Sequence, residues 1–370
     1  MSFCVQNYEK RMKVSQKKRI FAPIITKTIE FMKRAILFSL LSALMLTVSA
    51  QSIEEPFWLG ADISGTTGME AQGIQLTNTQ GEPRENTALM KELGLNAVRL
   101  RVWVNPKYHF SSKEDVLVMA RRAKEHGMAL MIDFHYSDWW ADPGKQNIPA
   151  AWVEMNYEEM CKALAEHTRE TLQLLKDNDI DVRWVQVGNE TTNGFLWPMG
   201  RAEDHMSQYA GLTKAGCEAV KAVYPDAKII IHLDGGCDPK RYNFIFDGLQ
   251  QYDCPWDIIG ISVYPYWDIE AKLESSWQGT IRDFTANIRA LYKKYHTPLM
   301  VVETGVESNK PEEGKQILAE IIRASKEDCE GHCLGVFYWA PEAEGHYPLG
   351  AFQDHKPTVI MEAFTEAAQQ

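Results

Sequence analysis

The sequence predicts a single (β/α)8 barrel with long loops after its strands. Eight short apolar runs recur along the chain, and helical patterns separate most of them. Each run is continuously apolar instead of alternating with polar residues, which indicates strands buried on both faces, as in a parallel sheet. The roughly 320 residues that follow the N-terminal segment suit one such barrel.

The predicted strands and helices alternate in chain order. The strands are residues 58–64, 97–104, 129–136, 183–190, 228–236, 257–267, 298–305 and 334–342. Helical periodicity covers residues 112–127, 157–178, 203–225, 280–296 and 311–327. A doubly wound open sheet is the alternative, but no glycine-rich phosphate loop follows the first strand, so the barrel is favoured.

The N-terminal segment has the features of an export signal. Residues 32–50 hold two basic residues, an apolar stretch and a final Val-Ser-Ala, which fits cleavage before Gln51. The apolar stretch is shorter than the roughly 20 residues that a membrane span needs, although a membrane anchor is the alternative. Residues 1–31 are interpreted as an upstream extension from a mis-assigned start. We therefore expect residues 51–370 to form the (β/α)8 domain of an exported protein.

The net negative charge of the chain disfavours negatively charged binding partners. The whole sequence carries −11, and residues 1–50 hold nine Lys or Arg and two Asp or Glu. The remaining residues therefore carry −18. Such a surface repels nucleic acid and anionic membranes and disfavours a polyanionic substrate. We expect a neutral ligand, no nucleic-acid partner, and a monomer.

Six cysteines follow the N-terminal segment, and export would permit disulfides. Cys329 and Cys333 lie in a polar loop where they could form a bond, and Cys237 and Cys254 could form another. The other two lie in helical patterns, as expected of buried free thiols. The "CEGHC" cluster offers only three soft ligands, so no metal site is predicted.

Polar and aromatic residues gather where the predicted strands end. In a (β/α)8 barrel the active site lies at this end of the strands. The candidates are Asp62, Arg101, Trp103, His135, Asp138, Trp139, Trp140, Asn189, Glu190, His232, Asp234, Tyr264, Tyr266, Glu303, Trp339 and Glu342. Any one of them has an even chance of a structural role, but an accidental gathering at all eight strand ends is improbable.

Two of these candidates indicate a reaction. Glu190 and Glu303 end strands four and seven, which face each other across a barrel of eight. Glycoside hydrolysis needs one protonated carboxyl to donate to the leaving oxygen and one carboxylate to attack or to activate water. Their surroundings must push the two pKa values apart.

Neighbouring residues suit the same chemistry. Asn189 could hydrogen-bond a sugar 2-hydroxyl, and Trp339 could lie under the C–H face of the sugar. Tyr264 could donate a hydrogen bond that keeps Glu303 ionised, and Arg101 could hold the same carboxylate by charge.

These motifs also carry a resemblance. "GNE" and "ETG" at the ends of strands four and seven resemble the acid/base and nucleophile of retaining glycoside hydrolases of clan A. "GADIS", "GLNAVRLRVWVNP", "DFHYSDWWADPGKQNIPAAW", "VQVGNETTNGFLWP" and "ISVYPYW" are similar to arabinogalactan endo-β-1,4-galactanases of glycoside hydrolase family 53, over residues 57–364. The resemblance implies Glu190 as acid/base and Glu303 as nucleophile, with His135, Asn189, Arg101, Tyr264 and Trp339 around the sugar.

The resemblance also marks a departure and leaves alternatives. The segment after Glu303 is short and lacks an insertion that helps to hold a structural calcium in some relatives, so no cofactor is expected. The two glutamates do not specify the sugar, so a mannanase, xylanase or cellulase of clan A is one alternative. A barrel that binds glycans without cleaving them is another. The Asp138-Trp139-Trp140 loop favours galactan, whose axial C4 oxygen bends the chain away from a flat cleft.

Overall fold

The computed structural model describes residues 55–370, of which Phe57–Gln370 form one compact unit. The expected extension at residues 1–31 and the expected signal at residues 32–50 lie outside the described residues. Among the described residues, no helix combines the length and apolar character that crossing a bilayer requires.

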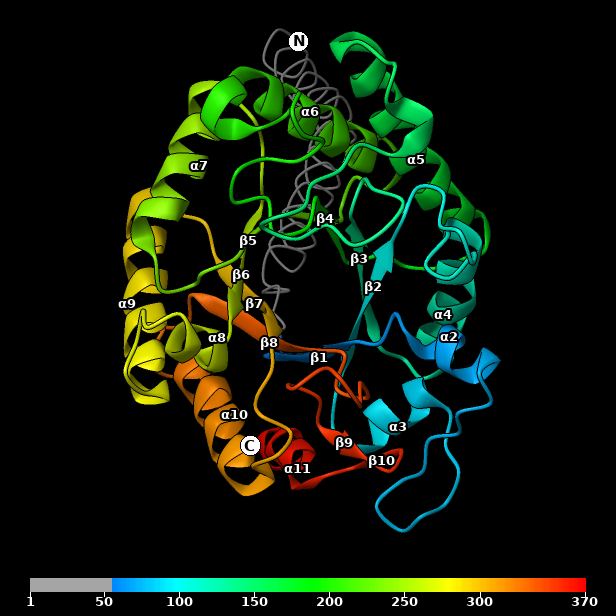
Figure 1. Ribbon diagram of the computed structural model, residues 1–370, viewed down its shortest axis with the longest axis vertical. Helices are drawn as coiled ribbons and strands as arrows, with labels where there is room; N and C mark the ends of the chain where they lie inside the picture. The colour runs from blue at the N-terminus through cyan, green and yellow to red at the C-terminus, as the bar shows by residue number, and fades with distance from the viewer. Residues whose placement is uncertain (1–54) are drawn as a thin grey trace, which may run out of the picture. The chain divides into compact units, whose positions relative to one another are not determined.

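The predicted (β/α)8 barrel is confirmed. Eight parallel strands pair in chain order, and β1 closes the barrel against β8 (Figure 1). The strands are β1 (Trp58–Asp62), β2 (Ala97–Val102), β3 (Ala129–Phe134), β4 (Trp184–Val187), β5 (Lys228–Leu233), β6 (Ile258–Val263), β7 (Leu299–Thr304) and β8 (Cys333–Trp339). Most are a few residues shorter than predicted, because the polar residues at their carboxyl ends already belong to loops.

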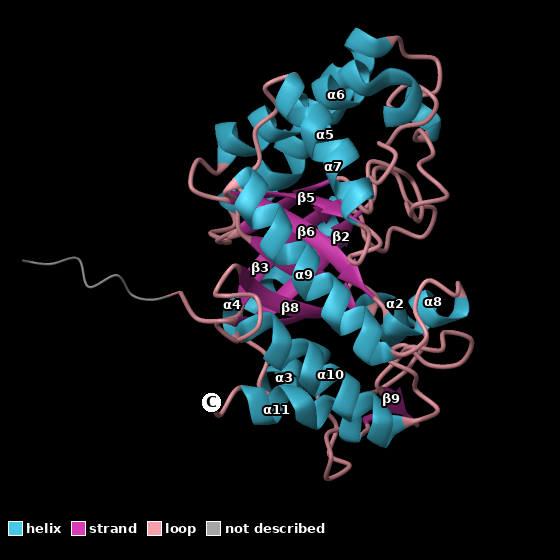
Figure 2. Cartoon of the chain, turned by 90° about the vertical axis from the view of Figure 1, so that its left-hand side faces the viewer, coloured by secondary structure: helices cyan, strands magenta, loops and turns pink. Residues whose placement is uncertain are grey.

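Helices surround the strands, and loops crowd one end of the barrel, where α2 and α8 lie (Figure 2). The helices are α2 (Thr66–Ala71), α3 (Asn86–Glu92), α4 (Lys113–Glu125), α5 (Tyr157–Asp177), α6 (Ala202–Val223), α7 (Pro239–Gln251), α8 (Pro265–Glu270), α9 (Trp277–Tyr295), α10 (Pro311–Lys326) and α11 (Glu362–Ala367). Two 3-10 turns, η1 (Ala150–Trp152) and η2 (Val359–Met361), and a short hairpin of β9 (Phe352–Gln353) and β10 (Lys356–Pro357) complete the chain.

Four of the five predicted helices, α4, α5, α9 and α10, begin where the sequence provides a cap or a proline. Asn156 and Glu159 form a capping box at the start of α5, and the Ser112 side chain caps α4. Helix α7 was not predicted, although Asp238 caps it and Pro239 stands at its first position. These two residues were the signal that could have found it.

The barrel interior changes character along the strands. Side chains at alternate positions of each strand point inward. Toward the amino-terminal ends of the strands, the interior is filled by an apolar cluster: Ala97, Met131, Trp184, Ile230, Ile258, Met300, Val302 and Phe337. Two residues further along the same strands stand Arg99, Asp133, Gln186 and His232, each fully buried. The apolar layer thus supports a polar layer directly beneath the loops.

The six described cysteines are free thiols. The pairings considered for Cys329 with Cys333 and for Cys237 with Cys254 are therefore not formed. Cys217 is fully buried, as its helical pattern predicts, and Cys161 is half-buried.

Candidate active site

Glu190 reaches the barrel mouth through a turn that needs a glycine. Strand β4 ends at Val187, and Gly188 follows with φ 88°, a left-handed conformation that side chains disfavour. A Cβ at Gly188 would lie 2.5 Å from Thr191 Cγ2. Glu190 itself has φ 46°, so the backbone is strained where it presents the carboxylate.

Glu303 reaches the same space through an irregularity in β7. The register between β6 and β7 shifts after Ile261, so that Val301 pairs with Ile261 and Glu303 with Ser262. This bulge lets both Val302 and Glu303 face the barrel interior, although regular alternation would send one of them outward. Val302 packs in the apolar layer, and Glu303 lies above it.

The two carboxylates lie close together. Oxygen atoms of Glu190 and Glu303 and a ring nitrogen of His232 all lie within 4.8 Å of one another. The Ser262 hydroxyl donates to Glu190 Oε1 at 2.7 Å and is itself 2.8 Å from His232 Nε2. The short separation leaves no room for a water between the carboxylates, which suits direct attack by one of them on a bound sugar.

The charge partner of Glu303 is Arg99, and the expectation that Arg101 holds this carboxylate was wrong. Arg99 Nη2 lies 2.8 Å from Glu303 Oε1 and 2.9 Å from Asp133 Oδ2, while Nη1 lies 2.7 Å from Asp62 Oδ2. Arg101 is two residues further along β2. Its guanidinium is 4.6 Å from the Trp103 ring centre and 4.0 Å from that of Trp140, a cation–π position.

The expected hydrogen bond from Tyr264 to Glu303 is present. The Tyr264 hydroxyl donates to Glu303 Oε2 at 3.1 Å. Arg99 and Tyr264 therefore contact the two different oxygens of this carboxylate. Both contacts favour its ionised form.

Burial is the main influence on the pKa values of both carboxylates. Burial raises the pKa of Glu190 well above its usual value, and the charge of Glu303 raises it further. Burial raises the pKa of Glu303 to about 7, and the charge of Arg99 opposes this rise. Arg99 and Tyr264 favour the ionised form of Glu303, whereas the charge of Glu303 favours the protonated form of Glu190.

A cleft of about 610 Å³ opens above the pair. Eight of the predicted site residues line it: His135, Trp140, Asn189, Glu190, Asp234, Tyr264, Glu303 and Trp339. The rings of Trp140 and Trp339 are 5.6 Å apart, and Tyr347 packs 4.8 Å from Trp339. These three aromatic side chains provide flat apolar surface of the kind that sugar C–H faces contact.

Several of the other predicted site residues lie around the cleft instead of lining it. Asp62 pairs with Arg99, and His232 holds Ser262. Trp103 packs against Trp139, which is 53% exposed. Asp138 accepts hydrogen bonds from the backbone N–H groups of residues 105 and 150, so it braces its loop.

The Glu190–His232–Glu303 cluster also has the composition of a metal site. His232 Nε2 bonds Ser262, and His232 Nδ1 lies 2.9 Å from Gln186 Nε2 and 3.0 Å from Asn189 Oδ1. Both ring nitrogens are thus engaged by protein groups. The arrangement suits proton transfer better than metal binding.

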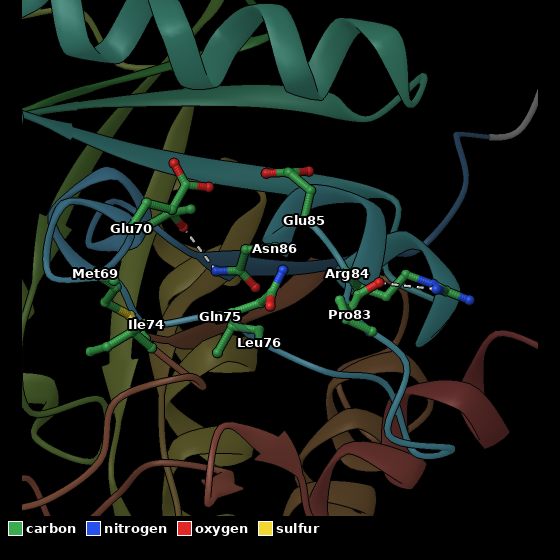
Figure 3. A pocket seen from close by; sticks show the side chains of 11 residues that line it. Met69, Glu70, Ile74, Gln75, Leu76, Pro83, Arg84, Glu85 and Asn86 are labelled. Carbon is green, nitrogen blue, oxygen red and sulfur yellow. Dashed lines mark hydrogen bonds between the residues drawn. The ribbon is translucent and has the colours of Figure 1, made fainter.

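A second cavity, of about 520 Å³, lies between α2 and the start of α3. Figure 3 shows it from close by, with Asn86 among the side chains of Glu70, Gln75 and Glu85. None of the predicted site residues lines it. The reaction chemistry is therefore assigned to the cleft above Glu190 and Glu303.

Comparison with known proteins places the chain in a family. The profile of glycosyl hydrolase family 53 matches residues 58–316. This protein belongs to glycosyl hydrolase family 53. The family 53 chain is therefore a glycosidase, as its paired carboxylates predict.

Named relatives and a solved structure agree with this membership. The endo-beta-1,4-galactanase of Bacillus subtilis strain 168 is 29% identical over 321 residues, covering 79% of this chain and 71% of that protein. The arabinogalactan endo-beta-1,4-galactanase A of Emericella nidulans is 29% identical over 338 residues, covering 85% and 93%. A structure of a fungal beta-1,4-galactanase matches with a TM-score of 0.75 at 26% identity, covering 83% of this chain and 98% of that one.

Sequence reasoning missed several members of the glycosidase site. Arg99, Asp133 and Gln186 lie inside strands that were read as apolar runs, and Ser262 and Tyr347 were not considered. A charged side chain within a doubly buried strand is expensive unless it is paired. Because Arg99 and Asp133 occur in such strands, the sequence could have predicted that they form ion pairs inside the barrel.

Proposed function

We propose that this glycosidase is an endo-acting β-1,4-galactanase that retains the configuration of the anomeric carbon. The proposal rests above all on the oxygens of Glu190 and Glu303, which lie within 4.8 Å of each other. Retaining enzymes hold their carboxyl groups about 5–5.5 Å apart, whereas inverting enzymes need about 6.5–9.5 Å.

In the first step, Glu303 attacks the anomeric carbon and Glu190 gives its proton to the leaving glycosidic oxygen. The C1–O bond to the leaving chain breaks while a C1–O bond to Glu303 forms. Arg99 and Tyr264 hold the two Glu303 oxygens, so the carboxylate is aimed before the substrate arrives. The raised pKa of Glu190 keeps the acid protonated for this step.

In the second step, Glu190 is ionised and acts as a base. It removes a proton from water, the water oxygen bonds to the anomeric carbon, and the bond to Glu303 breaks. Glu190 regains its proton and Glu303 its charge, so the site returns to its starting state. Every group that these steps need is a side chain of this chain, and we propose that no cofactor or calcium ion takes part.

The sugar specificity comes from the relatives. Both named relatives are endo-β-1,4-galactanases, and the sequences align with this chain over most of its length. A mannanase, xylanase or cellulase activity remains the alternative that substrate tests must separate. An inert glycan-binding barrel is disfavoured, because both carboxylates and their partners are in place.

One experiment tests substrate and mechanism together. β-1,4-Galactan, mannan, xylan and cellulose are offered to the enzyme, and the products are sized while NMR follows the anomer first released. We expect oligosaccharides from galactan alone, released first as the β-anomer. Release of the α-anomer would contradict retention, and faster cleavage of another glycan would overturn the substrate.

We also propose export and a monomeric state. The apolar stretch and the Val-Ser-Ala sequence before Gln51 support export, and the −18 charge of the remainder suits a neutral glycan. N-terminal sequencing of the exported protein should begin at or near Gln51. Recovery of residues 1–31 on that protein would contradict the proposal, and light scattering checks the monomer.

A further inference from the structure

Two buried thiols from different parts of the chain lie around one carbonyl oxygen. Cys217 lies on α6, and Cys254 lies between α7 and β6. The Cys217 Sγ is 3.4 Å from the carbonyl oxygen of Pro255, and the Cys254 Sγ is 4.0 Å from the same oxygen. The two thiols are also hydrogen-bonded to each other. A disulfide between them requires the sulfur atoms to move from this contact to about 2 Å.

The partner that the sequence suggested for Cys254 is engaged elsewhere. The Cys237 thiol donates to the carbonyl oxygen of Thr280 at 3.3 Å and to Asp268 Oδ2 at 3.6 Å. These contacts tie Cys237 to α8 and α9. The geometry therefore favours Cys217 as the partner of Cys254.

A bond between Cys217 and Cys254 would enclose a complete strand and helix. The ring would run from α6 through all of β5 and α7 to the residues before β6. A cross-link that closes so long a ring removes many conformations from the unfolded chain. Cys217 is 0% exposed and Cys254 is 4% exposed, and both pack in the same apolar core, so the bond would lie away from solvent.

We propose that Cys217 and Cys254 form a disulfide when the protein folds in an oxidising compartment, and that the structure shows the reduced form of this pair. The oxidant is a small disulfide such as glutathione disulfide. One cysteine thiolate attacks it and releases one glutathione thiolate, and the second cysteine thiolate attacks the mixed disulfide and releases the other. The two cysteines lose two protons and two electrons, and one glutathione disulfide becomes two glutathione thiols.

Burial determines when this bond can form. The thiolate is the reactive form of cysteine, and the hydrogen bond with Cys254 together with burial raises the pKa of Cys217 well above its usual value. The folded, reduced protein should therefore react slowly with disulfides. We expect oxidation while the chain folds, before the two thiols become buried.

Refolding under two redox conditions tests the proposal. The full chain is reduced and denatured, and is then refolded with reduced and oxidised glutathione or with dithiothreitol. Free thiols are labelled with N-ethylmaleimide in denaturant, and peptides are identified by mass spectrometry. We expect a peptide that joins Cys217 to Cys254 after refolding with glutathione, and label on both cysteines after refolding with dithiothreitol. Folded, reduced protein placed in the same glutathione mixture should keep both thiols for longer than the refolding sample does.

Stability provides the second readout. In urea, the equilibrium constant for unfolding should be at least about 30-fold smaller for the oxidised protein than for the reduced protein. Cys254→Ala and Cys217→Ala should each abolish this difference. Cys161→Ala is the matched control, because Cys161 is a half-buried thiol on α5, and it should keep both the cross-link and the difference.

Other outcomes would overturn the proposal. Label on both Cys217 and Cys254 after refolding with glutathione would do so, as would a peptide that joins Cys254 to Cys237 instead. Equal stability of the oxidised and reduced proteins would contradict the effect of the ring. Because none of these readouts uses enzyme activity, the result does not depend on the galactanase function.

Discussion

Arg99 and Glu303 form an ion pair inside the barrel, with 2.8 Å between Arg99 Nη2 and Glu303 Oε1. The Arg99 side chain is fully buried and also pairs with Asp62 and Asp133. Burial alone would lower the pKa of the Arg99 guanidinium, but the negative charges of Asp133, Glu303 and Asp62 outweigh this effect. The pKa of Arg99 is therefore raised, and the side chain stays positively charged. The proposed nucleophile is therefore held by a cation that is itself fixed on two further sides.

Replacing Arg99 should damage both catalysis and stability. Arg99→Lys keeps one charge but cannot reach all three carboxylates, so kcat should fall at least about 100-fold. The free energy of unfolding should fall by about 3 kcal/mol, because buried carboxylates lose their partner. Steady-state kinetics and urea unfolding measure the two effects.

Arg101→Lys is the matched control for this change. Arg101 is also buried on β2, but it stacks with Trp103 and Trp140. Its replacement should cost less than about tenfold in kcat. An equal loss of kcat in the two variants would contradict the assignment of Arg99 as the charge partner.

Removing each catalytic carboxylate should leave a different residual activity. Glu190→Ala keeps the nucleophile, so a galactosyl substrate with a good leaving group still forms the covalent intermediate. Hydrolysis of that intermediate is then slow, and azide, which needs no general base, should restore turnover and give a β-galactosyl azide. Glu303→Ala should lose activity on good and poor leaving groups alike. Formation of a β-galactosyl azide by Glu303→Ala instead would reverse the two roles.

The pH dependence of kcat/KM should follow from the two raised pKa values. Glu303 must be ionised, so activity falls as the pH drops through its pKa of about 7. Glu190 must be protonated, so activity falls as the pH rises through its own raised pKa. Because the two carboxyl groups interact, the acidic and basic limbs of the pH profile report the apparent pKa values of the pair and not of either residue alone. We expect an acidic limb well above pH 4.5, and a limb at the usual carboxylate value would contradict the burial effect.

Glu190→Gln provides a check on the basic limb. With β-galactobiosyl fluoride, whose leaving group needs little protonation, this variant should lose the basic limb while the acidic limb persists. Persistence of both limbs would show that another group titrates on the basic side.

A buried acid away from the pair should make stability depend on pH. Glu342 is 2% exposed, and burial raises its pKa to about 8. Between pH 4.5 and 8 the folded state keeps a proton that the unfolded state has lost, so the free energy of unfolding falls as the pH rises. Glu342→Gln cannot ionise, so its stability should not fall in this way. The free energy of unfolding of Glu342→Gln relative to the wild type should therefore rise by about 3 kcal/mol between pH 6 and pH 9. Urea unfolding at the two pH values measures this.

The control for Glu342 is an exposed glutamate. Glu218→Gln on α6 should follow the wild-type pH dependence. If Glu342→Gln also follows it, the raised pKa is contradicted.

Two glycines in left-handed conformations separate strain from function. Gly188→Ala would place a Cβ 2.5 Å from Thr191 Cγ2 at φ 88° and displace Glu190. Gly127→Ala has φ 62° but meets no atom within 4 Å. Gly127→Ala should lose about 1 kcal/mol of stability and Gly188→Ala more than that, because of its added clash. Only Gly188→Ala should lose kcat, by about tenfold or more. Equal kcat values in the two variants would contradict the role of Gly188.

The sequence by itself determined the barrel and its reactive carboxylates. Continuous apolar runs identify doubly buried strands, because a parallel sheet inside helices exposes neither face. Glu190 and Glu303 were found because polar residues just after such strands must lie at the loop end of the barrel. These inferences depend only on periodicity and on the order of residues along the chain.

The tertiary structure alone decided which cation holds Glu303. Arg99 and Arg101 are both inward positions of β2, two residues apart, and chain order does not say which lies level with β7. The stagger of the strands and the bulge at Val302 in β7 set that level. Arg99 therefore contacts Glu303, while Arg101 stacks on Trp140. The role of Asp138 as a loop brace was likewise decided by how different loops fold over the barrel. Contacts between distant segments leave no local pattern in the sequence.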